Sequence, residues 1–172
     1  MALKRLNINN IRNLANIEIF PHPRINVIYG RNGAGKTSIL EAIHILGSGK
    51  SFRSSKSSDV RTHNTETMRV TAQCVMLNEQ EHQLGWERAE NTRKIHIDSK
   101  AVQSVSYLAK FVPVRAIQPD THYRFRSQNK FRRSMLDWGV FHVKPRFQEN
   151  WQRYTRILHQ RNEYLKQGSV KE

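Results

Sequence analysis

The chain has 172 residues, 37% of them hydrophobic, which suits one domain or one domain and the start of another. Its formal charge of +15 favours a polyanionic partner, such as a nucleotide or a nucleic acid. No run approaches the ~18–20 apolar residues of a membrane span, and the first ten residues lack the apolar centre of a secretory signal. Cys74 is the single cysteine, so no internal disulfide can form. We therefore expect a folded cytoplasmic protein with a modest core and no membrane partner.

Two short strands are predicted at the beginning of the chain. Residues 2–9 alternate, with Leu3, Leu6 and Ile8 as the apolar members. Ile17 and Ile19 repeat this pattern before Pro21-His22-Pro23, which must end it. We expect an antiparallel pair joined by a turn that carries Arg12.

A glycine-rich motif follows between a predicted strand and a predicted helix. Residues 25–29, Ile-Asn-Val-Ile-Tyr, predict a short buried strand. Residues 30–37, Gly-Arg-Asn-Gly-Ala-Gly-Lys-Thr, then fit G-x-x-x-x-G-K-S/T at every position. Apolar residues at helical spacing over 39–46 predict a helix that stops at Gly47. This order of strand, loop and helix distinguishes a phosphate-binding loop from a chance match.

The residue types of this motif suit a nucleoside triphosphate. Glycines let successive backbone N–H groups point at one anion, and the following helix adds its free N–H groups and its dipole. Lys36 is expected to reach the β- and γ-phosphates, and the Thr37 hydroxyl to hold Mg²⁺. The alternative is a glycine-rich turn without a ligand, which the complete motif makes less favoured.

A second stretch, residues 47–58, is small, polar and basic and predicts a mobile loop. Its glycines and Lys50 also suggest another phosphate site. Because no strand precedes it and the G-K-S/T spacing is missing, the loop interpretation is favoured.

The middle of the chain predicts antiparallel strands. Residues 68–75, 81–88 and 94–98 have strand patterns, and the segments between them have hairpin length. Cys74 lies in an apolar stretch and is expected to be a buried thiol. Residues 112–117, with Pro113 near their start, predict a further strand.

Basic helices are predicted from Lys130 onward. Apolar positions with helical spacing continue to about Gln167, and Pro145 suits the first turn of the last helix. Residues 110–172 carry 14 Lys and Arg against 5 acidic residues, so they hold +9 of the charge. Cations interleaved with aromatic residues suit contact with DNA or RNA. The alternative is a solvated basic face. The candidate DNA-binding residues are Arg124, Arg126, Lys130, Arg132 and Arg133.

Four stretches together resemble the RecF family of bacterial recombinational repair proteins. They are L-x-I-x-N-x-R-N at 6–13, G-x-N-G-x-G-K-T-S-I-L-E-A-I at 30–43, G-x-G-K-S-F-R-S at 47–54 and F-R-R-S-M-L-D-W-G-V-F-H at 131–142. The resemblance covers nearly the whole chain. It implies an α/β P-loop NTPase fold of the ABC-ATPase head type, with an antiparallel β subdomain and the start of a helical lobe. Residues 1–120 would form the ATP-binding head, and residues 121–172 a basic helical segment.

The resemblance also assigns roles to residues. Arg12 would lie close to the nucleotide, Ser38 beside the magnesium, and Gln118 would join the metal site. The residues that would bind ATP are Gly30, Arg31, Asn32, Gly33, Ala34, Gly35, Lys36, Thr37 and Ser38. The family further implies ATP-dependent homodimerisation, binding to single-stranded and gapped double-stranded DNA, and help from RecR and RecO in loading RecA.

Three parts of an ABC ATPase are not found in the sequence. These are a signature segment, an apolar strand ending in paired acidic residues, and a switch histidine. The resemblance places them beyond residue 172, so the chain is expected to be an incomplete N-terminal half with no catalytic residue. We expect it not to hydrolyse ATP at a useful rate alone, and to be marginally stable.

Two other functions remain open. The first is a basic nucleic-acid-binding module with a vestigial nucleotide loop. The second is another P-loop enzyme, such as a kinase. It is less favoured because the predicted strand at 112–117 ends in no carboxylate.

Overall fold

The computed structural model describes residues 1–168, which divide into a first unit, Met1–Ala116, and a second unit that begins at Ile117. The expected domain boundary at residue 120 falls close to this division.

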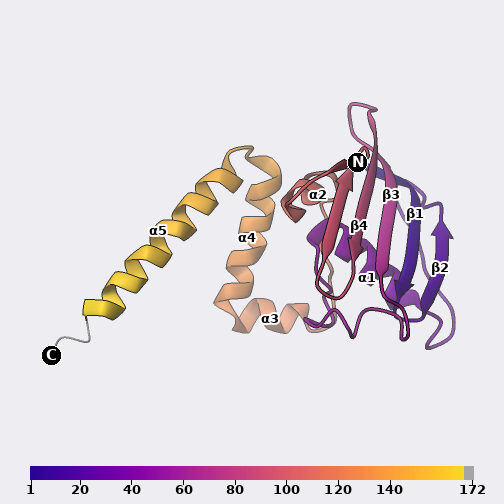
Figure 1. Cartoon of the computed structure of the whole chain (residues 1–172), viewed down its shortest axis with the longest axis horizontal. Coiled ribbons are helices and arrows are strands. Elements are labelled where there is room, and N and C mark those ends of the chain that lie inside the picture. Colours follow the sequence, from indigo (N-terminus) through magenta and orange to yellow (C-terminus); the bar gives the residue numbers. More distant parts are fainter. Residues whose placement is uncertain (169–172) are drawn as a thin grey trace. The chain divides into compact units, whose positions relative to one another are not determined.

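The first unit is built on a six-stranded antiparallel sheet with the order β2-β1-β3-β4-β5-β6 (Figure 1). Its strands are β1 (Ala2–Ile11), β2 (Leu14–Ile19), β3 (Met68–Val75), β4 (Glu81–Arg88), β5 (Arg93–Ile97) and β6 (Lys100–Ala101). The two N-terminal strands and the meander from residue 68 are confirmed. The two-residue strand β6 was not predicted.

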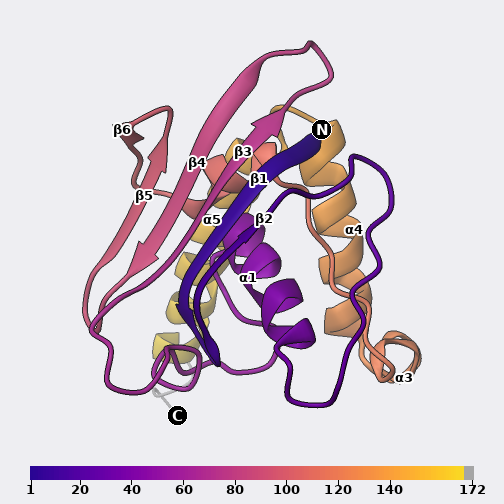
Figure 2. The same cartoon turned by 90° about the vertical axis from the view of Figure 1, so that its right-hand side faces the viewer.

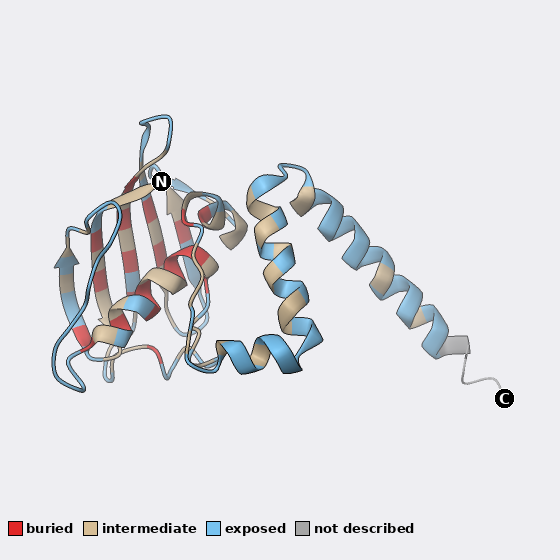
Figure 3. Cartoon of the chain, turned by 180° about the vertical axis from the view of Figure 1, so that it is seen from behind, coloured by how far each residue is buried: buried red, intermediate tan, exposed pale blue. Residues whose placement is uncertain are grey.

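Helix α1 (Lys36–Ser48) covers one face of the sheet (Figure 2), and the short helix α2 (Val105–Phe111) packs against α1. Side chains alternate along the strands, so Leu6, Val70 and Trp86 face the core with exposed fractions of 2% or less. Bands of buried residues on the strands and on α1 mark this core in Figure 3. Cys74 is buried and free, as predicted. Helix α2 was not predicted, although Ser104 caps it by accepting a hydrogen bond from the Ser106 N–H.

The predicted strand at 25–29 is wrong. The segment has no regular secondary structure and belongs to no sheet. Ile25 is 77% exposed, Val27 79% and Tyr29 88%. A β-type sequence forms a strand only where a neighbouring strand takes up its backbone hydrogen bonds, and no described strand lies beside this segment.

The predicted strand at 112–117 is also wrong, for a related reason. Its backbone lies against α1 instead of a strand, and an added Cβ at Gly47 would lie 2.5 Å from the Val112 carbonyl oxygen. Gly47 therefore allows this close approach and does not end the helix as predicted. Helix α1 continues to Ser48 and is capped by Gly49, whose φ is 69° and whose N–H donates to the Ile45 carbonyl.

The second unit contains three helices: α3 (Thr121–Ser127), α4 (Asn129–Val143) and α5 (Phe147–Gly168). The two longer helices are confirmed, whereas α3 was not predicted. Pro145 lies in the turn before α5 and not in its first turn as predicted. No side chain described in these three helices is buried. None of the helices in residues 1–168 combines the length and apolar character needed to cross a bilayer.

Candidate nucleotide-binding site

The loop at residues 30–35 has a curled backbone that requires glycine. The φ angles of Gly33 and Gly35 are 82° and 94°, in the left-handed region that other residues seldom adopt. At Gly35 an added Cβ would also lie 2.6 Å from Leu14 Cδ2. The packing of the loop on the β1–β2 turn therefore depends on the missing side chain.

The backbone N–H groups of the loop are mostly available. Among the described residues of the loop, Ala34 donates to a carbonyl of the same loop, that of Arg31, at 3.2 Å. No backbone acceptor within residues 1–168 takes the N–H groups of Gly33, Gly35, Lys36 and Thr37. Since α1 begins at Lys36, these donors stand at the positive end of its dipole. The site can therefore hold an anion.

The Lys36 side chain folds back onto the first residues of this loop. Its Nζ donates to the Gly30 and Arg31 carbonyls, both at 2.8 Å. Thr37 is exposed, so its hydroxyl can reach a metal ion, whereas Ser38 is buried and donates from Oγ to Asn13 Oδ1 at 3.0 Å. The structure thus brings Gly30–Thr37 together in one site, with Ser38 beneath it.

Asn13 supports the loop from the β1–β2 turn, a role that the sequence did not predict. Its Nδ2 donates to the Gly33 carbonyl at 2.9 Å while its Oδ1 accepts from Ser38. Asn13 is the last residue of the L-x-I-x-N-x-R-N motif, and this position could have indicated its role. From that motif we predicted a role for Arg12 only.

Arg12 binds a buried carboxylate in this structure. Its Nε and Nη2 donate to the two carboxylate oxygens of Glu41, at 3.0 and 2.9 Å. Its Nη1 donates to the Asp59 carbonyl. Glu41 is fully buried on α1 and also accepts from Ser51 Oγ. These bonds tie the β1–β2 turn, α1 and the 51–59 loop together, and a role for Arg12 at the nucleotide stays a prediction.

The ionisation of this pair follows from its contacts. Burial raises the Glu41 pKa, but the hydrogen bonds from Arg12 and Ser51, together with the charges of Arg12 and Arg53, outweigh burial and hold the pKa below its ordinary value. The hydrogen bond to Glu41 raises the Arg12 pKa. Glu41 is therefore a charged structural group. A carboxylate within the apolar run Ile39–Ile43 was the indication in the sequence.

The five candidate DNA-binding cations lie on α3 and α4 of the second unit. Arg132 Nη1 donates to the Phe125 and Arg126 carbonyls at 3.0 and 2.9 Å, and the Arg124 guanidinium stands 4.6 Å from the centre of the Phe131 ring. These two arginines hold α3 against α4. The other three, Arg126, Lys130 and Arg133, are exposed.

Gln118 also lies in the second unit, just before α3. Its backbone N–H donates to Thr121 Oγ1 at 2.8 Å, and its carbonyl accepts from the Thr121 N–H at 2.9 Å. These contacts involve its backbone, so its role as a metal ligand stays a prediction.

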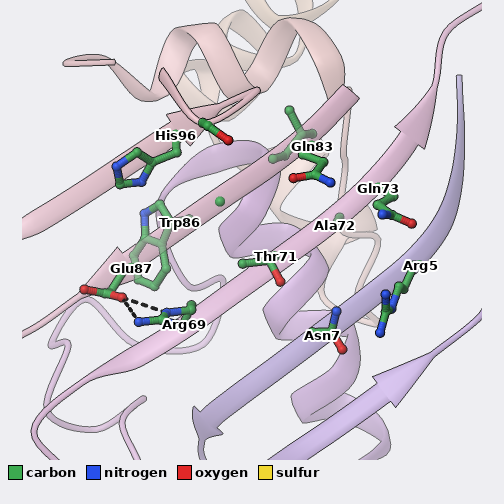
Figure 4. Close-up of a pocket in the computed structure, with 13 residues that line it drawn as sticks. Arg5, Asn7, Arg69, Thr71, Ala72, Gln73, Gln83, Trp86, Glu87 and His96 are labelled. Atoms are coloured by element: carbon green, nitrogen blue, oxygen red, sulfur yellow. Dashed lines mark hydrogen bonds and ion pairs between the residues drawn. The ribbon is translucent and has the colours of Figure 1, made fainter. Parts of the chain in front are cut away.

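The face of the sheet opposite α1 carries a polar hollow of about 560 Å³ (Figure 4). Asn7, Thr71, Gly85 and His96 stand side by side across four strands, and Gly85 leaves the gap between its neighbours. At the edge of the hollow, Arg69 Nε donates to Glu87 Oε2 at 2.7 Å. Because a positive and a negative side chain both border it, this hollow does not indicate an anionic ligand.

Residues 1–168 contain no cluster of three His, Cys, Asp or Glu side chains that could hold a metal.

Comparison with known proteins decides the family. The family model described as RecF/RecN/SMC N terminal domain matches residues 2–120. The chain belongs to this family. Over 171 residues it is 41% identical to the DNA replication and repair protein RecF of Pseudomonas entomophila, covering 99% of this chain and 47% of that protein. The same figures hold for RecF of Pseudomonas syringae pv. tomato. The chain thus spans about half the length of these curated relatives.

Solved structures give the same result. The recombination mediator protein RecF-ATP in the RecFOR pathway superposes with a TM-score of 0.83 at 25% identity, covering 96% of this chain and 45% of that one. A second structure, RecF-ATPrS, has a TM-score of 0.79 at 24% identity and shares the fold. The resemblance to the N-terminal portion of RecF and the ABC-ATPase head type of fold are both confirmed.

Proposed function

We propose that this chain is the ATP-binding N-terminal part of a RecF-type DNA replication and repair protein. One observation carries the proposal: the N–H groups of Gly33, Gly35, Lys36 and Thr37 lie at or just before the start of α1 and have no backbone acceptor within residues 1–168. A triphosphate tail is the ligand that such a loop binds in P-loop proteins. The related solved structure is described as RecF-ATP, which supports the choice of ATP.

The residues of the site have distinct roles in this proposal. The glycine-loop amides and the α1 dipole hold the phosphates, and Lys36 exchanges the Gly30 and Arg31 carbonyls for the β- and γ-phosphates. The exposed Thr37 hydroxyl takes one position on Mg²⁺, with phosphates and water supplying others. Gln118 is a further candidate ligand to this metal.

A thermal unfolding experiment tests ATP binding. At 100 times Kd, ATP with Mg²⁺ adds about 2.7 kcal/mol to the stability of a domain that binds it only when folded. We expect this stabilisation for the parent chain and for Lys100→Ala, an exposed lysine on β6, but not for Lys36→Ala. Equal stabilisation of both variants would contradict the site. No stabilisation of the parent, with DNA binding retained, would instead favour the nucleic-acid-binding module with a vestigial loop.

Hydrolysis is proposed to need more than these residues. Glu41 is the single carboxylate on α1, and it is buried and paired with Arg12, so it cannot activate an attacking water. We expect no steady phosphate release from the purified chain. Release that Lys36→Ala abolishes would overturn this expectation.

DNA binding is proposed for the second unit, through Arg126, Lys130 and Arg133. Replacing all three with Gln should weaken binding to a single-stranded oligonucleotide and reduce the salt slope of log K by about 0.7 for each phosphate that is no longer neutralised. The matched control replaces three exposed arginines just before α5 and in its first half, Arg146, Arg153 and Arg156. An equal decrease in affinity for the two triple variants would refute a local site.

The remaining parts of the proposal concern the whole protein. They are a head over residues 1–120 followed by a basic helical segment over 121–172, a cytoplasmic location, contact with single-stranded and gapped double-stranded DNA, partnership with RecR and RecO in loading RecA, and an ATP-dependent homodimer. Two relatives are named as DNA replication and repair proteins, and a solved one as a recombination mediator of the RecFOR pathway.

A further inference from the structure

A second hollow in the first unit, of about 480 Å³, gathers positive charge. The loop after α1 lines it with Lys50, Arg53, Lys56 and four serines, and β4 adds Arg88. None of the described residues that line it is acidic. We call it the basic hollow. Four cations around a cavity of ligand size favour an anionic occupant.

Most of the cations that line the basic hollow form no ion pair with the described residues. Within residues 1–168, Lys50, Lys56 and Arg88 form no ion pair, and both lysines are exposed. Arg53 has a long contact, 3.4 Å from Nη1 to Glu41 Oε2. A ligand would therefore meet three cations without an ion pair, of which Lys56 also lies near enough to Asp59 to lower the pKa of that carboxyl, and a fourth cation that is partly shared with Glu41.

The loop that carries these cations has a defined shape. Ser51 Oγ accepts from the N–H groups of Arg53 and Ser54, at 2.8 and 3.0 Å. Ser54 Oγ in turn donates to Asp59 Oδ2 at 2.7 Å. Of the predicted loop over residues 47–58, residues 49–58 lie outside the helices and strands, whereas Gly47 and Ser48 still belong to α1, and its mobility stays a prediction. These bonds shape the part of the loop between Lys50 and Lys56.

Trp86 provides an independent indication of a ligand. Its side chain is 2% exposed, and its Nε1 has no hydrogen-bond partner among the described residues. Alternation along β4 places Trp86 among the buried residues on the face that α1 covers, and it lines both the basic hollow and the polar hollow of Figure 4. Buried N–H donors rarely lack an acceptor, and an oxygen of a bound anion would supply one here.

The basic hollow is separate from the glycine loop. Ile45 and Gly49 line it, and at 1.5 Å per residue they stand roughly 14 and 20 Å along α1 from Lys36. Phosphates held at the start of the helix therefore do not occupy it.

We propose that the basic hollow binds backbone phosphates of a nucleic-acid strand, as a second contact of this chain with DNA. The proposal rests on the DNA binding proposed above and adds a site in the first unit. The chemistry recognised is a phosphate ester, which a free nucleotide could also present, so the test includes both.

The test uses the full chain, a labelled single-stranded oligonucleotide and ADP. Lys50→Gln, Lys56→Gln and Arg88→Gln are combined, and the control combines Arg24→Gln, Lys100→Gln and Lys110→Gln, which remove the same charge away from the hollow. We expect the first variant to lower affinity for the oligonucleotide at least tenfold more than the control. The salt slope of log K should fall by about 0.7 for each phosphate that the variant no longer neutralises.

A spectroscopic measurement reports on the hollow directly. In ¹H–¹⁵N spectra the indole N–H signal of Trp86, assigned with Trp86→Phe, should shift when the oligonucleotide is added. ADP at the same phosphate concentration should shift it little. Equal affinities of the two triple variants, an unmoved Trp86 signal, or an equal shift with ADP would each overturn the proposal. Loss of binding in the Arg126, Lys130 and Arg133 variant alone would leave the proposed function standing without the hollow. No oligonucleotide binding by any variant or the parent would remove both.

Discussion

Strand β3 and residues 25–29 both have a composition that favours β structure, but they lie in opposite environments. Both are rich in β-branched residues, but β3 pairs with β1 and with β4, whereas residues 25–29 pair with no described strand. Val70 on β3 is fully buried, and Val27 is 79% exposed. Their difference shows that β propensity describes how well a side chain fits between neighbouring strands, and that it does not form a strand alone.

The exposed segment also borders an apolar hollow of about 540 Å³, lined among others by Leu3, Ile19, Val27 and Leu40. Apolar surface of this kind promotes association. We expect the sheet and α1 to carry most of the stability of the first unit and residues 25–29 to add little.

The largest loss is expected for Glu41→Ala, on the side of α1 that faces the β1–β2 turn. It removes a buried carboxylate and leaves the Arg12 guanidinium, itself 22% exposed, without its partner. Breaking a buried pair in this way costs about 3–5 kcal/mol. Urea unfolding followed by far-ultraviolet circular dichroism measures it.

The control for Glu41 is Glu18→Ala, which removes an exposed carboxylate paired with Arg5 on neighbouring strands. Such a pair contributes about 0–1 kcal/mol. If both variants lost the same stability, the Glu41 network would not be what joins the turn, the helix and the loop.

A matched pair of isoleucines tests the comparison itself. Ile8→Ala on β1 removes a side chain with no exposed surface and should cost about 2–5 kcal/mol. Ile25→Ala removes one that is 77% exposed and should change stability by no more than about 0.5 kcal/mol. The same urea titration serves both. A large loss for Ile25→Ala would show that residues 25–29 are packed in solution.

Two glycines inside helices give a smaller effect of opposite sign. Gly47→Ala would place a Cβ 2.5 Å from the Val112 carbonyl oxygen and from Val114 Cγ1, so it should destabilise the first unit by about 1–3 kcal/mol. Gly139→Ala on α4 meets nothing within 4 Å and should stabilise its helix by about 0.5–1 kcal/mol. Hydrogen exchange of α1 and α4 separates the two effects. Stabilisation by Gly47→Ala would mean that residues 112–114 do not hold their place against α1.

The sequence predicted what local pattern determines. Alternation indicated β1 to β5, helical spacing indicated α1, α4 and α5, and the G-x-x-x-x-G-K-S/T motif located the glycine loop. It could not predict whether residues 25–29 would find a neighbouring strand, since pairing depends on segments remote in the chain. The short elements β6, α2 and α3 carry too few residues to show a period.

In the candidate site, too, some residues could be predicted from the sequence and others could not. Lys36 and Thr37 follow from the spacing of the loop, but the partners Arg12 and Glu41 are 29 residues apart and meet only because the β1–β2 turn packs on α1. The sequence did not favour a phosphate site in the loop of the basic hollow, because no strand precedes that loop. The fourth cation of the hollow, Arg88, comes from β4, and the unpaired Trp86 N–H is visible only in the folded chain.

The smallest expected effect is a pH dependence of stability that arises from His44, near the C-terminal end of α1 and the basic hollow. His44 Nδ1 lies 2.8 Å from the Lys50 carbonyl oxygen, and burial lowers the His44 pKa below its ordinary value. The unfolded chain therefore takes up this proton at a higher pH than the folded chain. Stability should fall as the pH drops below about 6.5 and level off once the folded-state pKa is passed. The stabilisation from Glu41, whose pKa is lowered in the folded state, is lost only at more acidic pH.

The variant His44→Gln tests this pH dependence. In urea unfolding it should flatten the fall in stability between pH 7.5 and 5.5. His22→Gln, which replaces an exposed histidine close to residues 25–29 in the sequence, should not. If the pH dependence of stability were unchanged in His44→Gln, the His44 side chain would be exposed to water in solution. The C-terminal end of α1 would then resemble the exposed residues 25–29 and not the buried strand β3.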